Sequence, residues 1–388
     1  MSNPRVRRVM LACSLGGEGH LVPLARVGRA VQAAGHEVKL LVPPALADSA
    51  QRTGLAYRVG EEPPRAFLDE IWHRVRAGPA EAVAGLFDRE LFADRCTEAM
   101  LGAARDLRDS WRPQFVVREP CEYASAVAAH ETGIPHAEVG VSLASIESGV
   151  LRMVAPIIER FSPGVAAAIA SSPYLSSFPT SLDPSPWSDT RRFRAAAARR
   201  NVTSGPARNR EQPLVYVTFG SVLGHLPEAS AVFRCALEAV AGLPARVLLT
   251  VGRATDVPSL GSIPENTRVE QWVPQDLVLE HAAVVVCHGG SGTTFGALAA
   301  GVPLVVCPLF ADQLTNARIV QDSGAGMVLG GHTPASGGLG SLGPNDVAPL
   351  RARIEEVLGT PSYRHAASRI AAEIAALPTL QDVVRRLI

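Results

Sequence analysis

The chain of 388 residues contains almost no lysine, since every one of its 37 basic residues except Lys39 is an arginine. Lys39 lies in the apolar stretch from Glu37 to Val42, without the glycine-rich loop that a P-loop requires. ATP chemistry of the P-loop type is therefore excluded. The 37 basic residues are balanced by 37 acidic ones, so the chain lacks the excess positive charge that nucleic-acid binding requires.

Metal-binding and redox motifs are also missing. The six cysteines form no Cys-x-x-Cys pair, and the chain has no Asp-x-Asp, no His-Glu-x-x-His and no cluster of histidine and cysteine along the sequence. We therefore expect reduced thiols, no metal ion and no cofactor. No apolar run approaches the roughly 20 residues of a membrane span, and the run Val9 to Cys13 is too short for a secretion signal. A cytoplasmic protein is expected.

The alternation of apolar and polar segments predicts an α/β fold with two doubly wound domains. Residues 1–200 alternate strands and helices, and a second alternation occupies residues 214–375. Residues 201–213 are polar and contain glycine and two prolines, as interdomain linkers do. A dinucleotide-binding fingerprint is absent, because Val22 stands where the third glycine of Gly-x-Gly-x-x-Gly is required. We expect two Rossmann-like domains that face a cleft, without NAD.

Two polar residues follow predicted strands of the first domain. His20 follows Gly16-Gly17-Glu18-Gly19, and Glu119 follows Phe115-Val116-Val117-Arg118. The carboxyl ends of parallel strands lie side by side, and a carboxylate bonded to one imidazole nitrogen prepares the other to accept a proton. The sequence thus predicts a general base. Three alternatives stay open: His20 caps a helix, Glu119 pairs with a neighbouring arginine such as Arg118, or Glu122 is the partner of His20.

Three segments of the second domain follow predicted strands and suit a nucleotide sugar. Trp272 can stack on a base, and the glycine-rich turn after His288 opens a helix whose N–H groups can bind a pyrophosphate. His288 and Ser221 can donate to a phosphate, and Asp312 with Gln313 can bind sugar hydroxyl groups. Structural alternatives remain for each of them: a core tryptophan, a strand-end histidine, a capping serine and an N-terminal helix cap.

With these segments on one chain, the sequence resembles the inverting nucleotide-sugar glycosyltransferases of the GT-B architecture, and among them the bacterial enzymes that modify antibiotics and related natural products. The resemblance covers essentially the full chain. It is carried by Gly17-Glu18-Gly19-His20, Trp272-Val273-Pro274-Gln275, His288-Gly289-Gly290-Ser291-Gly292-Thr293 and Asp312-Gln313.

The resemblance implies a role for each matching residue. His20 would deprotonate the acceptor hydroxyl, and Glu119, where the family usually has aspartate, would hold the imidazole. The Val273 backbone would read the base edge, and Gln275 would reach the ribose. Residues 376–388 would form a helix that returns to the first domain. The donor site would comprise Ser221, Trp272, Val273, Gln275, His288, Gly290, Ser291, Gly292, Thr293, Asp312 and Gln313.

The donor nucleotide is suggested by one departure from the family pattern. Relatives that use UDP-sugars commonly carry a glutamate eight residues after the histidine of the glycine turn, and this chain has Gly296 there. We expect a dTDP-sugar, typically a deoxysugar, as donor and a small hydrophobic aglycone as acceptor, with inversion and without a metal. The alternative is that Gly296 only permits close helix packing.

Other functions remain open at this point. A non-catalytic nucleotide-sugar-binding homologue and a nucleotide-sugar epimerase of the same fold are the alternatives to transfer. The aglycone, the sugar, the choice between O-, N-, S- and C-linkage and the formation of a homodimer are not determined by the sequence.

Overall fold

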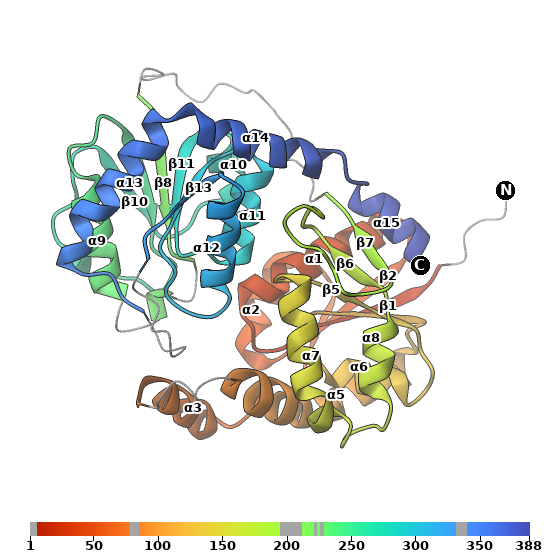
Figure 1. Ribbon diagram of the computed structural model, residues 1–388. Helices are drawn as coiled ribbons and strands as arrows, with labels where there is room; N and C mark the ends of the chain where they lie inside the picture. The colour runs from red at the N-terminus through yellow and green to blue at the C-terminus, as the bar shows by residue number, and fades with distance from the viewer. Residues whose placement is uncertain (1–5, 78–84, 195–211, 221–222, 226–228, 331–339) are drawn as a thin grey trace. The chain divides into compact units, whose positions relative to one another are not determined.

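The computed structural model describes residues 6–77, 85–194, 212–220, 223–225, 229–330 and 340–388. The chain divides into two compact units: unit 1 is Met1–Ala195 with Leu377–Ile388, and unit 2 is Ala196–Ala376. Each unit is an α/β layer structure built on one parallel sheet (Figure 1). The expected linker, residues 201–213, lies almost wholly outside the described residues.

Unit 1 has a seven-stranded sheet in the order β3-β2-β1-β4-β5-β6-β7. The strands are β1 (Arg8–Ala12), β2 (Glu37–Val42), β3 (Tyr57–Val59), β4 (Phe115–Arg118), β5 (His136–Val139), β6 (Tyr174–Ser176) and β7 (Thr190–Arg192). The helices are α1 (Glu18–Ala33), α2 (Ala47–Thr53), α3 (Arg65–Ala77), the π-helix η2 (Leu86–Cys96), α5 (Thr97–Trp111), α6 (Ala124–His130), α7 (Ala144–Ile158), α8 (Val165–Ser171) and α15 (Leu380–Leu387), with a short 3-10 turn η1 (Pro44–Leu46).

The central strands of the unit 1 sheet are buried on both faces. In β1, Val9 and Leu11 belong to an apolar cluster with α1 and α15, whereas Met10 and Ala12 belong to a cluster with α5 and α6. Successive side chains of a strand point to opposite faces, so the uninterrupted apolar run of β1 is what a parallel sheet covered on both sides requires. The core therefore holds the carboxyl end of β1 in a fixed position.

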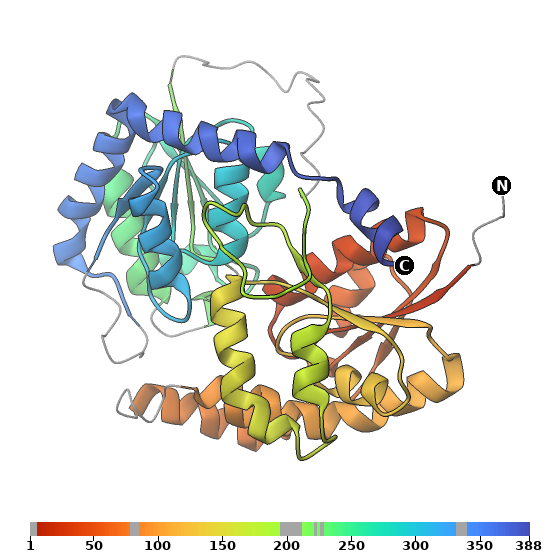
Figure 2. The ribbon, with the colours of Figure 1, turned by 45° about the vertical axis from the view of Figure 1, so that its right-hand side comes forward.

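The two ends of the sequence meet in unit 1. Helix α15 packs against α1, although the two helices stand at opposite ends of the chain (Figures 1 and 2). Leu380, Val383 and Val384 are buried in the same apolar cluster as β1. The helix begins at an N-cap, Thr379, whose side chain accepts a hydrogen bond from the Asp382 N–H.

Unit 2 has a six-stranded parallel sheet in the order β10-β9-β8-β11-β12-β13. The strands are β8 (Leu214–Thr218), β9 (Arg246–Thr250), β10 (Thr267–Glu270), β11 (Ala282–Cys287), β12 (Leu304–Val306) and β13 (Gly326–Val328). The helices are α9 (Ala229–Val240), α10 (Gln275–Leu279), α11 (Ser291–Ala299), α12 (Gln313–Asp322), α13 (Val347–Gly359) and α14 (Pro361–Ala375), with 3-10 turns η3 (Leu223–His225), η4 (Val257–Leu260) and η5 (Pro344–Asp346).

Some elements differ from the sequence expectation. Helix α1 begins at Glu18, so His20 does not precede the helix but lies in its first turn. Strand β10 has the sequence Thr-Arg-Val-Glu and is not an apolar run, because it is an edge strand with one unpaired side. Within the described part of the chain, no helix is both long and apolar enough to cross a bilayer.

Candidate active site

Both sheets reverse their strand order at one place, and the expected site residues follow the strands there. In unit 1 the reversal lies between β1 and β4, and in unit 2 it lies between β8 and β11. Ligands of open α/β sheets bind beyond the carboxyl ends of the strands at such a switch point. His20 and Glu119 follow β1 and β4, and His288 follows β11.

In unit 1 the structure brings His20 and Glu119 into direct contact. Nδ1 of His20 lies 2.7 Å from Oε2 of Glu119, across 99 positions of sequence. The Glu119 side chain is fully buried, whereas that of His20 is 21% exposed. The pair is thus a carboxylate beneath an imidazole that solvent and ligands can reach.

The Glu119 carboxylate is held in its ionised form. The backbone N–H of Ser14 donates to Oε1 and that of Cys121 donates to Oε2, both at 2.9 Å. Burial by itself raises the pKa of Glu119, but the neighbouring His20 and the two N–H donors outweigh it and lower the pKa below its usual value. An ionised carboxylate fixes the His20 tautomer with its proton on Nδ1.

Two local features position the His20 ring. A Cβ atom at Gly16 would lie 2.1 Å from the imidazole, so the ring occupies space that only glycine leaves open. Phe92, from the π-helix η2, stacks on the ring at 6.3 Å between centroids. The position of the His20 ring therefore requires glycine at position 16, and the role of Phe92 was not foreseen from the sequence.

Glu122, the alternative partner of His20, faces another group. Its carboxylate accepts hydrogen bonds from the N–H and hydroxyl of Ser125 at the start of α6. Burial raises its pKa to about 7, an effect that Ser125 and Arg118 partly offset. The structure thus pairs His20 with Glu119 and leaves Glu122 in a separate, poorly solvated environment.

The proposed surface pairing of Glu119 with Arg118 is wrong. Arg118 is completely buried and forms an ion pair with Glu138 on β5. Its Nη1 donates to the backbone carbonyls of Glu119 and Glu122, each at 3.1 Å. These hydrogen bonds from the guanidinium fix the position of the turn that carries the Glu119 carboxylate. The sequence offered one clue, which is an arginine at the end of an otherwise apolar strand.

In unit 2 the His288 ring lies between two glycines. A Cβ atom at Gly220 or Gly290 would approach the ring to 2.9 or 2.5 Å respectively. Burial lowers the pKa of His288 to about 4, against a smaller opposite effect of Asp312. At neutral pH the imidazole is uncharged and carries one N–H donor, and a hydrogen bond to the Thr218 backbone also acts to raise its pKa. Ser221, its expected companion, lies outside the described residues.

Helix α11 presents its N-terminus directly after His288. Gly290 is the N-cap residue, and the helix runs for nine residues from Ser291. The first N–H groups of a helix have no partner within it and carry a partial positive charge, which favours an anion. The Ser291 and Thr293 hydroxyls are otherwise engaged, since they donate to Asp312 Oδ2 at 3.0 Å and to Gln275 Oε1 at 3.1 Å.

The residues expected to bind sugar hydroxyls also organise the loop before α12. Asp312 Oδ2 accepts from Ser291 and from Asn316 Nδ2, at 3.0 and 3.2 Å. Gln313 is buried, and its Oε1 accepts from the N–H groups of Leu309 and Phe310 at 2.9 and 3.1 Å. The structure brings both residues to the N-terminus of α11. Asp312 is the N-cap residue of α12 but makes no capping bond with its side chain.

Trp272 is a surface residue, so the core alternative is wrong. It is 49% exposed, and the guanidinium of Arg253 lies 4.8 Å from the centre of its ring. Gln275, expected at the ribose, lies against α11, where a Cβ atom at Gly296 would come within 2.9 Å of Nε2. This contact provides a packing reason for Gly296.

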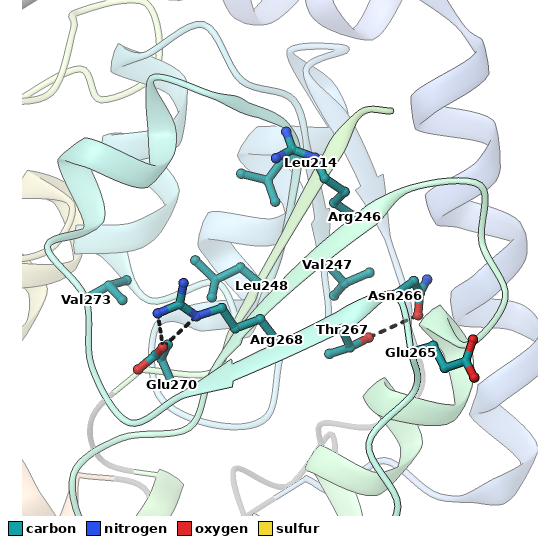
Figure 3. Close-up of a pocket in the computed structure, with 10 residues that line it drawn as sticks. All are labelled: Leu214, Arg246, Val247, Leu248, Glu265, Asn266, Thr267, Arg268, Glu270 and Val273. Carbon is teal, nitrogen blue, oxygen red and sulfur yellow. Dashed lines mark hydrogen bonds and ion pairs between the residues drawn. The ribbon is translucent and has the colours of Figure 1, made fainter. Parts of the chain in front are cut away.

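A groove of about 450 Å³ lies along strands β9 and β10 of unit 2. Figure 3 shows that its floor and walls come mainly from these strands, with an ion pair between Arg268 and Glu270 at one end. Of the residues expected to bind the nucleotide sugar, only Val273 is part of its lining. The groove therefore does not gather the candidate site residues. Its lining consists of Leu214, Arg246, Val247, Leu248, Glu265, Asn266, Thr267, Arg268, Glu270 and Val273.

One cluster of potential metal ligands was not evident from sequence spacing. His20, Glu119 and Cys121 each offer a ligand atom, and these atoms all lie within 4.8 Å of one another. The expectation that histidine and cysteine are not clustered therefore holds along the sequence but not in space. The folding of two strand ends onto each other creates the cluster.

Comparison with known proteins identifies the family. Residues 66–218 match the N-terminal domain, and residues 234–388 the C-terminal domain, of the family described as Erythromycin biosynthesis protein CIII-like. The L-demethylnoviosyl transferase of Streptomyces niveus is 31% identical over 96% of this chain and 95% of its own. The Elloramycin glycosyltransferase ElmGT of Streptomyces olivaceus is 32% identical over 74% of this chain and 71% of its own.

A solved structure has the same fold over nearly the whole length. It is the Spinosyn Rhamnosyltransferase SpnG complexed with thymidine diphosphate, with a TM-score of 0.74, 22% identity and coverage of 97% of this chain and 99% of that one. The two parallel sheets agree with this likeness in fold. The chain therefore belongs to the GT-B glycosyltransferases of antibiotic and natural-product biosynthesis.

Proposed function

We propose that this glycosyltransferase moves a sugar from a dTDP-sugar to a hydroxyl group of a small hydrophobic aglycone, in one displacement that inverts the anomeric carbon. The observation that carries the proposal is the 2.7 Å contact between His20 Nδ1 and the buried carboxylate of Glu119. In this reaction Nε2 of His20 accepts the acceptor proton while the acceptor oxygen attacks the anomeric carbon. The ionised Glu119 stabilises the imidazolium that forms.

The leaving group determines the roles in unit 2. As the bond to the anomeric carbon breaks, negative charge grows on the departing phosphate oxygen. The N-terminal amides of α11 and the neutral imidazole of His288 are fixed donors that stabilise this charge without reorganising. Asp312 and Gln313 bind sugar hydroxyls beside the same helix end. These donors support a mechanism that needs no metal ion.

The choice of dTDP rests on the absence of a side chain at Gly296, where a ribose 2′-hydroxyl would need a partner. Gly296 offers no side chain to a 2′-hydroxyl, and a hydroxyl left buried and unpaired costs about 1–3 kcal/mol. A deoxyribose avoids that cost. The related SpnG structure contains thymidine diphosphate, which is compatible with the proposal. Trp272 stacks on the base, which either displaces the Arg253 guanidinium from the ring or leaves it in place on the other side.

Two substitutions test the base. We expect His20→Ala to abolish transfer while the affinity for dTDP, measured by calorimetry, stays within a few-fold, because the base acts on the acceptor. General-base catalysis usually contributes about 10²–10⁴-fold. Glu119→Gln should lower kcat less than His20→Ala. A silent Glu119→Gln variant, or a loss of dTDP affinity as large as the loss of rate, would contradict the assignment.

The donor and the stereochemistry are tested separately. Titration of the protein with dTDP and UDP side by side should give tighter binding of dTDP, and equal or tighter binding of UDP refutes the preference. The anomeric coupling constant of the first product, read by NMR before equilibration, should report inversion. Retention would exclude the single displacement, whatever nucleotide the site prefers.

A further inference from the structure

Cys121 stands apart from the other cysteines in both position and accessibility. It is partly exposed, whereas Cys13, Cys96, Cys235, Cys287 and Cys307 are buried. It lies two residues after Glu119, and its own N–H donates to the Glu119 carboxylate. Its sulfur, the carboxylate and the His20 imidazole form the one group of three potential metal ligands among the described residues. A dissolved ion can therefore reach this group from the exposed side of His20.

The three ligand types match a particular class of ion. One imidazole nitrogen, one carboxylate oxygen and one thiolate sulfur form a set that suits Zn²⁺ or Co²⁺, whereas Mg²⁺ prefers oxygen ligands alone. Zinc–ligand bonds of about 2.0–2.3 Å at tetrahedral angles place such atoms about 3.4–3.6 Å apart. The present separations, from 2.7 Å between His20 and Glu119 to at most 4.8 Å, require shifts of roughly 1 Å.

The turn that bears two of the ligands is well supported. Arg118 donates to the carbonyl oxygens of Glu119 and Glu122, and the N–H of Ser14, two residues after β1, donates to the Glu119 carboxylate. The positive charge of Arg118 is neutralised by its ion pair with Glu138, so Arg118 adds little repulsion toward a cation bound nearby. Support of this kind around metal ligands fixes their direction and raises affinity.

We propose that His20, Glu119 and Cys121 bind a soft divalent cation of the zinc type, with one coordination position left open, and that the bound ion inhibits the enzyme. His20 binds through Nδ1, whose proton moves to Nε2 when the metal–nitrogen bond forms, and the Cys121 thiol releases its proton to solvent when the metal–sulfur bond forms. The inhibitory part rests on the proposed function of His20, because coordination withdraws the imidazole from its role as proton acceptor. The ion thus has no part in transfer and blocks the acceptor side of the reaction.

Binding is tested first, on the full-length protein without substrates. Addition of Co²⁺ should produce a thiolate-to-cobalt charge-transfer absorption that saturates at one ion per chain. Cys121→Ser should remove this band, and Cys121→Ala provides a second variant if the serine protein does not fold. Cys96→Ser is the matched control, because Cys96 is a neighbouring but buried thiol outside the cluster. Absence of the band in the native protein, or its persistence in both Cys121 variants, overturns the proposal.

Inhibition is tested second. Zn²⁺ should inhibit the native enzyme and Cys96→Ser, EDTA should restore full activity, and Mg²⁺ should have no effect. Cys121→Ser should keep its activity in EDTA and need at least about tenfold more Zn²⁺ for half inhibition. Equal Zn²⁺ sensitivity of native enzyme and Cys121→Ser would refute the inhibitory role. Because the cobalt band needs no turnover, failure of the proposed transfer reaction and failure of the metal site give different results.

Discussion

At the scale of single residues, two carboxylates on one turn have opposite acid–base behaviour. Glu119 is surrounded by an imidazole and two N–H donors, which lower its pKa, whereas burial raises that of Glu122 to about 7. They are three positions apart in sequence, and both are buried. The partner that a buried carboxylate finds, rather than its burial, therefore decides whether it serves as a permanent anion.

The raised pKa of Glu122 gives a prediction for stability. A carboxyl group whose pKa rises from 4.5 to about 7 on folding stabilises the protein fully only at pH values below 4.5, and this contribution is lost as the pH rises through 7. We expect Glu122→Gln to remove this loss, which is on the order of 3 kcal/mol. Denaturant unfolding at pH 5 and pH 8 should show the variant gaining stability relative to the native protein at the higher pH. The same difference at both pH values would show that Glu122 does not titrate in this range.

At the scale of elements, two glycines at the start of α1 have different surroundings: Gly16 precedes the helix, and Gly19 lies in its first turn. A Cβ atom at Gly16 would overlap the His20 ring, whereas one at Gly19 would meet nothing within 4 Å. We expect Gly16→Ala to displace the imidazole from Glu119 and lower kcat by at least about tenfold. Gly19→Ala should leave kcat nearly unchanged and stabilise the helix by roughly 0.5–1 kcal/mol.

Steady-state kinetics and thermal unfolding of the two variants check this prediction. A normal kcat for Gly16→Ala would mean that the ring does not need the space above that glycine. A large loss in Gly19→Ala would show that the approach of a ligand, rather than the ring position, accounts for the glycines of this turn.

Strand ends and glycine turns are the part of the structure that sequence patterns predict well. Uninterrupted apolar runs predict β1, β4, β8, β11 and β12, because a parallel sheet buried on both faces requires them. Edge strand β10 and the π-helix η2 lack such a pattern, since the edge strand is half exposed and a π-helix depends on tertiary packing. Phe92 was missed for that reason.

The candidate site likewise contains residues that the sequence predicts and contacts that it does not. Positions after strands predicted His20, Glu119 and His288, since the topology of a parallel sheet brings strand ends together. Sequence spacing could not reveal the buried Arg118–Glu138 pair or the approach of Cys121 to His20. Those contacts depend on which strands are neighbours and on the path of one turn, and both are properties of the folded chain.

At the scale of the whole molecule, unit 1 depends on the last residues of the chain. Val384 of α15 is completely buried in the cluster that contains β1, whereas Arg385 on the same helix is exposed and pairs with Asp382. We expect Val384→Ala to cost about 2 kcal/mol through loss of apolar contact and a remaining cavity. Arg385→Ala should cost less than about 0.5 kcal/mol, as exposed ion pairs do.

Hydrogen exchange distinguishes a local from a general effect. In Val384→Ala the amides of β1 and β2 should exchange faster, whereas those of β8 and β11 in unit 2 should be unchanged. Equal acceleration in both sheets would show that the two units unfold together, and unchanged exchange in β1 would show that α15 does not support that sheet.

The placement of α15 also has a consequence for synthesis on the ribosome. Unit 2 is continuous in sequence, so all of its residues are available before Leu377–Ile388 are translated. Unit 1 starts first but lacks one of its helices until Leu377–Ile388 have been translated, and until then the apolar surface of α1 and β1 that α15 covers stays open. Nascent chains expose such surfaces to aggregation and to chaperones. We therefore expect the N-terminal half to be the last part of the protein to become native in the cell.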